Sequence, residues 1–127
     1  MMYIADTHAL VWHLARDDRL GKNARKIFED ADNGDPEIAV PTIVLAEALF
    51  LSRKGHVPFD SLMDSFQNAR NYSVYPLGLN VISAMRKLSA EYSMHDAAIV
   101  ATAKVLEAPV ITRDEVIRRL GDVKVIW

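Results

Sequence analysis

The chain has 127 residues, the length of one domain, and half of them are hydrophobic, which suffices for a sizeable core. The absence of cysteine excludes a disulfide scaffold, a thiolate nucleophile and a cysteine-ligated zinc site. No signal peptide is apparent, and no apolar run approaches the roughly 20 residues that cross a bilayer, so we expect a cytoplasmic protein with no membrane partner. The net charge of −2 neither predicts nor forbids nucleic-acid binding.

The first half of the chain alternates short apolar runs with helical patterns. A predicted strand over Met2–Ala5 ends at Asp6, and the next residues, Thr7–Ala15, predict a helix that is apolar nearly all round. Lys22–Ala31 has the hydrophobic spacing of an amphipathic helix. A second strand is predicted at Ile38–Val40. It is followed by a helix over Thr42–Arg53 that ends before Gly55.

The second half continues the alternation. Pro58 suits the first turn of a helix that we expect to run to about Ala69, and Tyr72–Tyr75 alternates like a strand. A helix is predicted over Val81–Glu91, with Ile82, Met85 and Leu88 on its apolar stripe. The remaining predicted elements are a buried helix at Asp96–Leu106, a strand at Val110–Thr112, a short helix at Glu115–Leu120 and a strand at Val123–Trp127. Strands interleaved with helices predict an α/β sandwich with a mostly parallel, five-stranded sheet.

Three acidic residues stand where strands end or helices begin. In an open parallel sheet, ligands bind outside the carboxyl ends of the strands, so Asp6 and Asp114 are candidates for a site. Asp96 opens a predicted helix. Each also has an ordinary structural explanation, because Asp6 could cap the following helix, and Asp96 and Asp114 lie in segments with capping-box spacing.

Glu47 is harder to explain as a structural residue. On a helix, its neighbours three and four positions away are Ile43, Val44, Phe50 and Leu51, all apolar. A buried carboxylate without a partner would cost several kcal/mol, so we expect a cation near it. That cation could be a lysine or arginine side chain, or a metal ion.

Taken together, the four carboxylates predict one pocket with a hard cation. Carboxylates held close together repel one another unless a cation lies among them. Mg²⁺ or Mn²⁺ prefers oxygen ligands and keeps bound waters that can take part in chemistry. Beside this pocket, Thr112 could hydrogen-bond a carboxylate or a substrate phosphate, or simply cap its strand end, and Arg113 could contact phosphate.

The segments that carry these residues resemble the motifs of a known family. Residues 3–10 (Tyr-Ile-Ala-Asp-Thr-His-Ala-Leu), the helix with Glu47, residues 95–103 and residues 110–114 resemble, in order, the motifs of PIN-domain toxins of the virulence-associated toxin C (VapC) family. The resemblance spans the whole chain and implies one PIN-like three-layer domain over residues 1–127.

The resemblance also implies a function and the residues that perform it. It implies a metal-dependent RNA endonuclease, the toxin of a type II toxin–antitoxin pair, that cleaves phosphodiester bonds with Mg²⁺ or Mn²⁺. The family's acidic set maps onto Asp6, Glu47, Asp96 and Asp114. Of these, Asp6 and Asp96 would be the principal metal ligands, Asp114 would complete the site, and Glu47 would bind a second metal or orient the attacking water. Some relatives carry a further acid after the last motif, where this chain has Val116 and Ile117.

Two alternatives remain open at this point. One keeps the fold without catalysis, as a binding module whose acids only position a partner. The other is a receiver-like signalling domain, which also gathers acids around Mg²⁺. That class needs a pair of acids after the first strand, whereas this chain has Ala5-Asp6-Thr7.

The two helices that are apolar on nearly every side predict a protein partner. A helix of this kind must be buried all round, and a small domain has little interior for two of them. We therefore expect Thr7–Ala15 and Ile43–Leu51 to form part of a groove for another protein chain, with Trp12 and Phe50 in contact with it and a homodimer contact elsewhere. The family resemblance implies that this other chain is an antitoxin. The alternative is that both helices are simply central in the fold.

Overall fold

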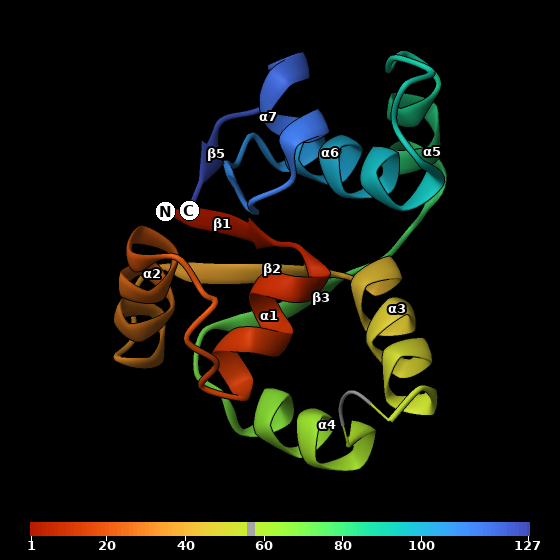
Figure 1. The fold of residues 1–127 in the computed structure, drawn as a ribbon. Helices are drawn as coiled ribbons and strands as arrows, with labels where there is room; N and C mark the ends of the chain where they lie inside the picture. The colour runs from red at the N-terminus through yellow and green to blue at the C-terminus, as the bar shows by residue number, and fades with distance from the viewer. Residues whose placement is uncertain (56–57) are drawn as a thin grey trace.

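A five-stranded sheet forms the middle layer of the computed structural model, which describes residues 1–55 and 58–127 (Figure 1). Its strands are β1 (Met2–Ala5), β2 (Glu37–Pro41), β3 (Tyr72–Tyr75), β4 (Val110–Ile111) and β5 (Val125–Ile126). They lie in the order β3-β2-β1-β4-β5, and every neighbouring pair is parallel. The α/β sandwich predicted from the sequence is confirmed, with a sheet that is parallel throughout.

Helices cover both faces of this sheet. They are α1 (Thr7–Leu14), α2 (Lys22–Asp32), α3 (Thr42–Arg53), α4 (Phe59–Asn68), α5 (Leu79–Met85), α6 (Met94–Leu106) and α7 (Glu115–Leu120). In the view of Figure 1, α5, α6 and α7 lie above strands β1, β2 and β3, α4 lies below these strands, and α2 lies at the left beside β2. Within the described ranges, no helix is both long and apolar enough to cross a membrane.

The strand order reverses at β1. The chain builds β2 and β3 on one side of β1 and then crosses to the other side to form β4 and β5. β1 and β4 are paired through Ile4 with Val110 and Ala5 with Ile111, and the backbone N–H of Asp6 donates to the Ile111 carbonyl at 3.2 Å. Their carboxyl ends therefore lie side by side at the point where open α/β sheets bind ligands.

The two apolar helices are buried to different degrees. In α1, Ala9 and Leu10 are fully buried and Trp12 is 4% exposed, so this helix is central in the fold and Trp12 offers almost no surface to a partner. This corrects the expectation that Trp12 would contact an antitoxin. In α3, Val44 and Ala48 are buried but Phe50 is 59% exposed, so this helix does present an apolar side chain to solvent.

The helix predicted over Val81–Glu91 was the least accurate prediction of an element. The observed helix α5 begins earlier, at Leu79, and ends at Met85. After Met85 the α-helical hydrogen bonds give way to a tighter turn, in which the N–H of Leu88 donates to the carbonyl of Met85, three residues earlier, at 3.1 Å. The predicted stripe is wrong at Ile82, which is 48% exposed, while Val81 is fully buried in its place; Leu88 does pack against the core.

Candidate active site

A cavity of about 460 Å³ lies where the carboxyl ends of β1 and β4 meet the starts of α1 and α6. All four acidic residues singled out by the sequence line it, and they come from four different parts of the chain: Asp6, Glu47, Asp96 and Asp114. The remaining lining residues are Thr7, His8, Ser93, His95, Ile99, Arg113 and Trp127. The fold thus brings the predicted residues together, as expected from their positions at strand ends and helix starts.

Asp6 is fixed by the backbone that follows it. It is the N-cap of α1, and its Oδ1 accepts a hydrogen bond from the N–H of Ala9 at 2.8 Å. Burial raises its pKa to about 6 from an ordinary value of 3.8, and the nearby charge of Asp114 adds to this rise. Hydrogen bonds from Thr112 and Ala9, together with His8, act in the opposite direction. Asp6 therefore caps α1, which agrees with the structural explanation considered from the sequence, and it is also a carboxyl group with a raised proton affinity.

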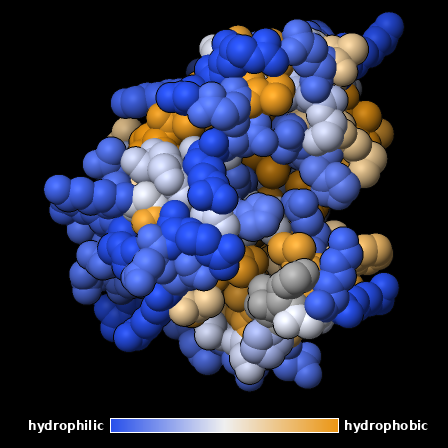
Figure 2. Space-filling model, in the orientation of Figure 1, coloured by the Kyte–Doolittle hydropathy of each residue, from blue (hydrophilic) through white to orange (hydrophobic). Residues whose placement is uncertain are grey.

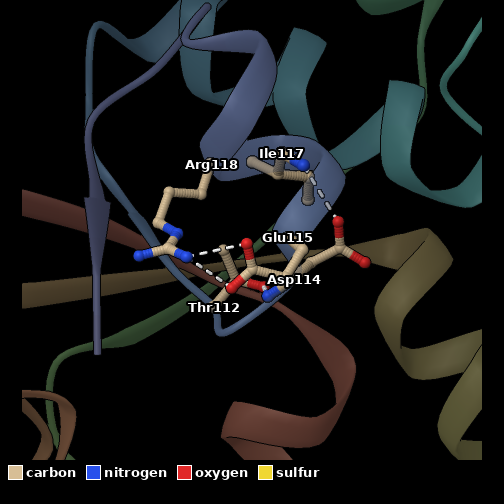
Figure 3. A network of polar contacts seen from close by, with 5 residues as sticks. All are labelled: Thr112, Asp114, Glu115, Ile117 and Arg118. Carbon is tan, nitrogen blue, oxygen red and sulfur yellow. Dashed lines mark hydrogen bonds and ion pairs between the residues drawn. The ribbon is translucent and has the colours of Figure 1, made fainter.

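Asp114 is held in a similar way at the start of α7 (Figure 3). Its Oδ1 accepts from the N–H of Ile117 at 2.9 Å, and its own N–H donates to Oγ1 of Thr112 at 3.0 Å. Thr112 is fully buried, so its hydroxyl is a fixed link between the end of β4 and Asp114. Asp114 uses its Oδ1 for the cap, so its Oδ2 is available as an acceptor.

Asp96 and Glu47 complete the acidic lining. Asp96 lies in the first turn of α6, where its N–H donates to Oγ of Ser93 at 3.1 Å. Burial raises the pKa of Asp96, and the charges of Asp114 and Glu47 raise it further. Glu47 is half-buried, and its Oε1 accepts a hydrogen bond from the hydroxyl of Thr7. Within the described part of the chain, no arginine or lysine forms an ion pair with Glu47.

The four carboxylates line the same cavity but are not in close contact with one another. Their charges act on each other, since Asp114 raises the pKa of both Asp6 and Asp96. Even so, among the residues that the structure describes, no three His, Asp or Glu side chains are close enough together to hold a metal ion as they stand. The site therefore has the right donor atoms for a hard cation in an open arrangement.

Sequence reasoning missed several residues that border the cavity. Thr7 orients Glu47 through its buried hydroxyl, and its place directly after Asp6 was the available signal. His95, beside Asp96, also lines the cavity. The sequence pattern places Trp127 only at the end of the last strand, whereas in the structure it lines the cavity and packs edge-on against Trp12 at 5.9 Å between ring centroids.

The raised pKa of Asp6 predicts how stability depends on pH in the absence of metal. Between about pH 4 and pH 6, the folded protein keeps a proton on Asp6 that the unfolded chain loses, so stability falls as the pH rises through this window. Asparagine can cap α1 but carries no charge. The gain in free energy of unfolding from Asp6→Asn should therefore grow from near zero at pH 4 to about 2–3 kcal/mol at pH 7.

Urea unfolding of both proteins in EDTA at a series of pH values measures this difference. Comparing the two proteins cancels the titration of groups that do not interact with Asp6; His8 and Asp114, whose charges act on Asp6, are the exceptions. A difference that stays constant from pH 4 to pH 7 would show that Asp6 titrates at its ordinary pKa.

Comparisons with known proteins place this geometry in a wider context. The family model for the PIN domain matches residues 3–123. No curated protein sequence matches the chain. Among solved structures, the chain is similar to a chain in the crystal structure of VapBC2 from Rickettsia felis bound to a fragment of its promoter DNA. The TM-score is 0.75 and the sequence identity 18%, with 99% of this chain and 98% of that chain covered.

Two further structures show the same fold. A toxin–antitoxin complex from Klebsiella pneumoniae contains a chain with a TM-score of 0.70 and 21% identity, covering 98% of this chain and 96% of that one. VapC20 from Mycobacterium tuberculosis, described as a toxin that cleaves the sarcin-ricin loop, has a TM-score of 0.66 and 17% identity, with 95% of each chain covered. At these identities the likeness concerns the fold.

Proposed function

The chain belongs to the PIN-domain family, whose model matches residues 3–123, and on that premise we propose that it is a ribonuclease dependent on Mg²⁺ or Mn²⁺. We further propose that it is the toxin of a type II toxin–antitoxin pair and that residues 1–127 form one catalytic domain. The family assignment removes the receiver-like alternative. The remaining alternative is a PIN-fold binding module without catalysis.

One observation carries the proposal: four carboxylates from separate parts of the chain line one cavity at the point where the strand order reverses. A fold stabilised only by caps would not need Glu47 there, because Glu47 lies within α3 and caps nothing. Burial is the main cause of the raised pKa values of Asp6 and Asp96, and the charge of Asp114 adds to both, so holding these acids in one cavity destabilises the metal-free protein. A binding function for a cation would explain why the acids lie together.

The residues fit a hard divalent cation by their chemistry. Carboxylate oxygens are the ligands that Mg²⁺ and Mn²⁺ prefer. The described side chains are too far apart to hold a metal ion as they stand, so in this proposal a bound cation would draw them together. A bound ion would lower the pKa of a coordinated water and neutralise charge that develops on the phosphate.

Each acidic residue has a role that follows from how it is held. Asp6 and Asp96 lie at the starts of α1 and α6, so their backbones are fixed, and we assign them as the principal ligands. Asp114 is fixed by its cap on α7 and completes the set. Glu47 is turned by Thr7 and would orient the attacking water or hold a second ion. Thr112 keeps Asp6 and Asp114 in place.

The direct test is to incubate purified protein with structured and unstructured RNAs in Mn²⁺ or in EDTA. We expect cleavage in Mn²⁺ and none in EDTA, with single-stranded DNA of the same sequence as a control for substrate class. Binding of RNA without cleavage in Mn²⁺ would favour the binding module instead.

The proposed partners are an antitoxin and a second copy of the chain. Among the described residues, seven large hydrophobic side chains are exposed, and five of them lie in the segment from β3 to the start of α6: Val74, Leu77, Leu79, Ile82 and Met94. Figure 2 shows hydrophobic residues at the surface over α5 and over α3. Exposed apolar patches of this kind mark interfaces. We assign the segment around α5 to the homodimer and the exposed face of α3 to the antitoxin.

Two substitutions separate these interfaces and serve as controls for each other. Leu79→Glu, at a side chain that is 83% exposed, should convert a dimer into a monomer without loss of antitoxin binding. Phe50→Glu should weaken capture of the protein encoded by the adjacent gene and leave the dimer intact. Light scattering measures the oligomeric state of both variants, and pull-down measures their binding to the antitoxin. Identical effects of the two variants would refute the assignment of two separate interfaces.

A further inference from the structure

The guanidinium of Arg113 lies beside the acidic cavity without pairing with any of its acids. Its Cζ lies 4.5 Å from the centroid of the Trp12 ring, and the side chain is exposed. Arg113 is the only arginine or lysine among the described residues that line the cavity. In the described part of the chain it forms no ion pair, although Asp6 and Asp114 border the same space.

Trp12 provides a rigid surface for this guanidinium. Its ring is 4% exposed, packs edge-on against Trp127 at 5.9 Å and lies 5.3 Å from the ring of His8. A second guanidinium, that of Arg19, lies 4.6 Å from the centroid of the same ring. The two arginines differ in one respect: Nε and Nη2 of Arg19 both donate to the carboxylate of Asp17, at 3.0 and 2.7 Å.

This difference leaves Arg113 with an uncompensated charge. Stacking uses the face of a guanidinium, so the N–H groups on its edge remain able to donate. If Arg113 instead paired with Asp6 or Asp114, it would neutralise a carboxylate that the proposed chemistry needs. Trp12 therefore keeps the cation near the cavity and off the acids.

A cavity lined by four acids repels a polyanion, so an RNA strand needs a cation near it. We propose that Arg113, held by Trp12, binds a phosphate of the RNA next to the one that is cleaved and thereby sets the position of the strand. Bidentate contact with phosphate oxygens suits the planar arginine fork better than a lysine ammonium. The inference rests on the proposed function, since it concerns the substrate of the same site.

The test measures RNA binding separately from cleavage. A fluorescein-labelled single-stranded RNA is titrated with protein in EDTA, and its anisotropy is followed at several salt concentrations. Arg113→Ala should weaken binding by about tenfold or more and reduce the slope of log affinity against log salt by about 0.7, the value for one phosphate contact on a single strand. Arg113→Lys should restore the salt slope but only part of the affinity.

Arg19→Ala is the matched control, because it removes a guanidinium from the same ring whose charge is already paired with Asp17. It should change RNA affinity less than twofold. Equal losses in Arg19→Ala and Arg113→Ala, or unchanged affinity in a folded Arg113→Ala protein, would overturn the assignment while leaving cleavage by the wild-type protein as evidence for the proposed function. A wild-type protein that neither binds nor cleaves RNA would overturn both.

Discussion

Replacing Asp96 by asparagine should lower the rate of RNA cleavage by more than about a hundredfold, because even residues that only support metal ligands cost 10–100-fold when changed. The variant should stay folded. Asparagine is nearly the same size, and its neutral side chain removes both the cost of burying a charge and the repulsion from Asp114 and Glu47, which together raise the pKa of Asp96.

Rates of cleavage in saturating Mn²⁺ and thermal unfolding curves check both halves of this prediction. Asp64→Asn, which removes an exposed carboxylate from α4 outside the cavity, is the matched control and should cleave RNA like the wild-type protein. A folded Asp96→Asn protein with an unchanged rate would show that this carboxylate has no part in the chemistry.

Replacing Phe28 by alanine should have the largest effect on stability, a loss of about 3–5 kcal/mol in the free energy of unfolding. Phe28 is a fully buried residue of α2, and its ring stacks on His13 at 4.4 Å and faces Tyr72 at 6.5 Å between centroids. Such a loss is a large part of the roughly 5–15 kcal/mol that stabilises a typical domain.

Phe50→Ala is the matched control, because it removes the same atoms from a side chain that is 59% exposed. It should change stability by no more than about 0.5 kcal/mol. Urea unfolding of the two variants measures the difference. Similar losses at both positions would mean that Phe28 is not the core residue that its burial indicates.

Much of the fold could be predicted because local signals and tertiary packing agree. A glycine marks the end of α3, which stops two residues before Gly55. A proline marks the end of β3, which stops directly before Pro76. The strand order could not be read from the sequence, because it depends on which strand edges pair. α5 was predicted too long, since the spacing of Ile82, Met85 and Leu88 continues through a turn that the backbone does not follow as a helix.

The site was predictable to the extent that it depends on strand ends. Asp6 and Asp114 follow strands that turned out to be neighbours, so their positions followed from the fold class. The environment of Glu47 was not predictable in detail: it is half-buried at the cavity, and Thr7 contacts it instead of a cationic side chain. The stacking of Arg113 on the Trp12 ring was also not predicted, because the two residues are about a hundred positions apart in the sequence.

Calorimetric titration of metal-free protein with Mn²⁺ tests most directly whether the acidic cavity is a metal site with Asp6 and Asp96 as its principal ligands. We expect saturable binding to the wild-type protein and binding at least about tenfold weaker in the folded Asp6→Asn and Asp96→Asn variants. Equal affinity in the wild-type protein and both variants, or cleavage of RNA by a wild-type protein that binds no Mn²⁺, would contradict it.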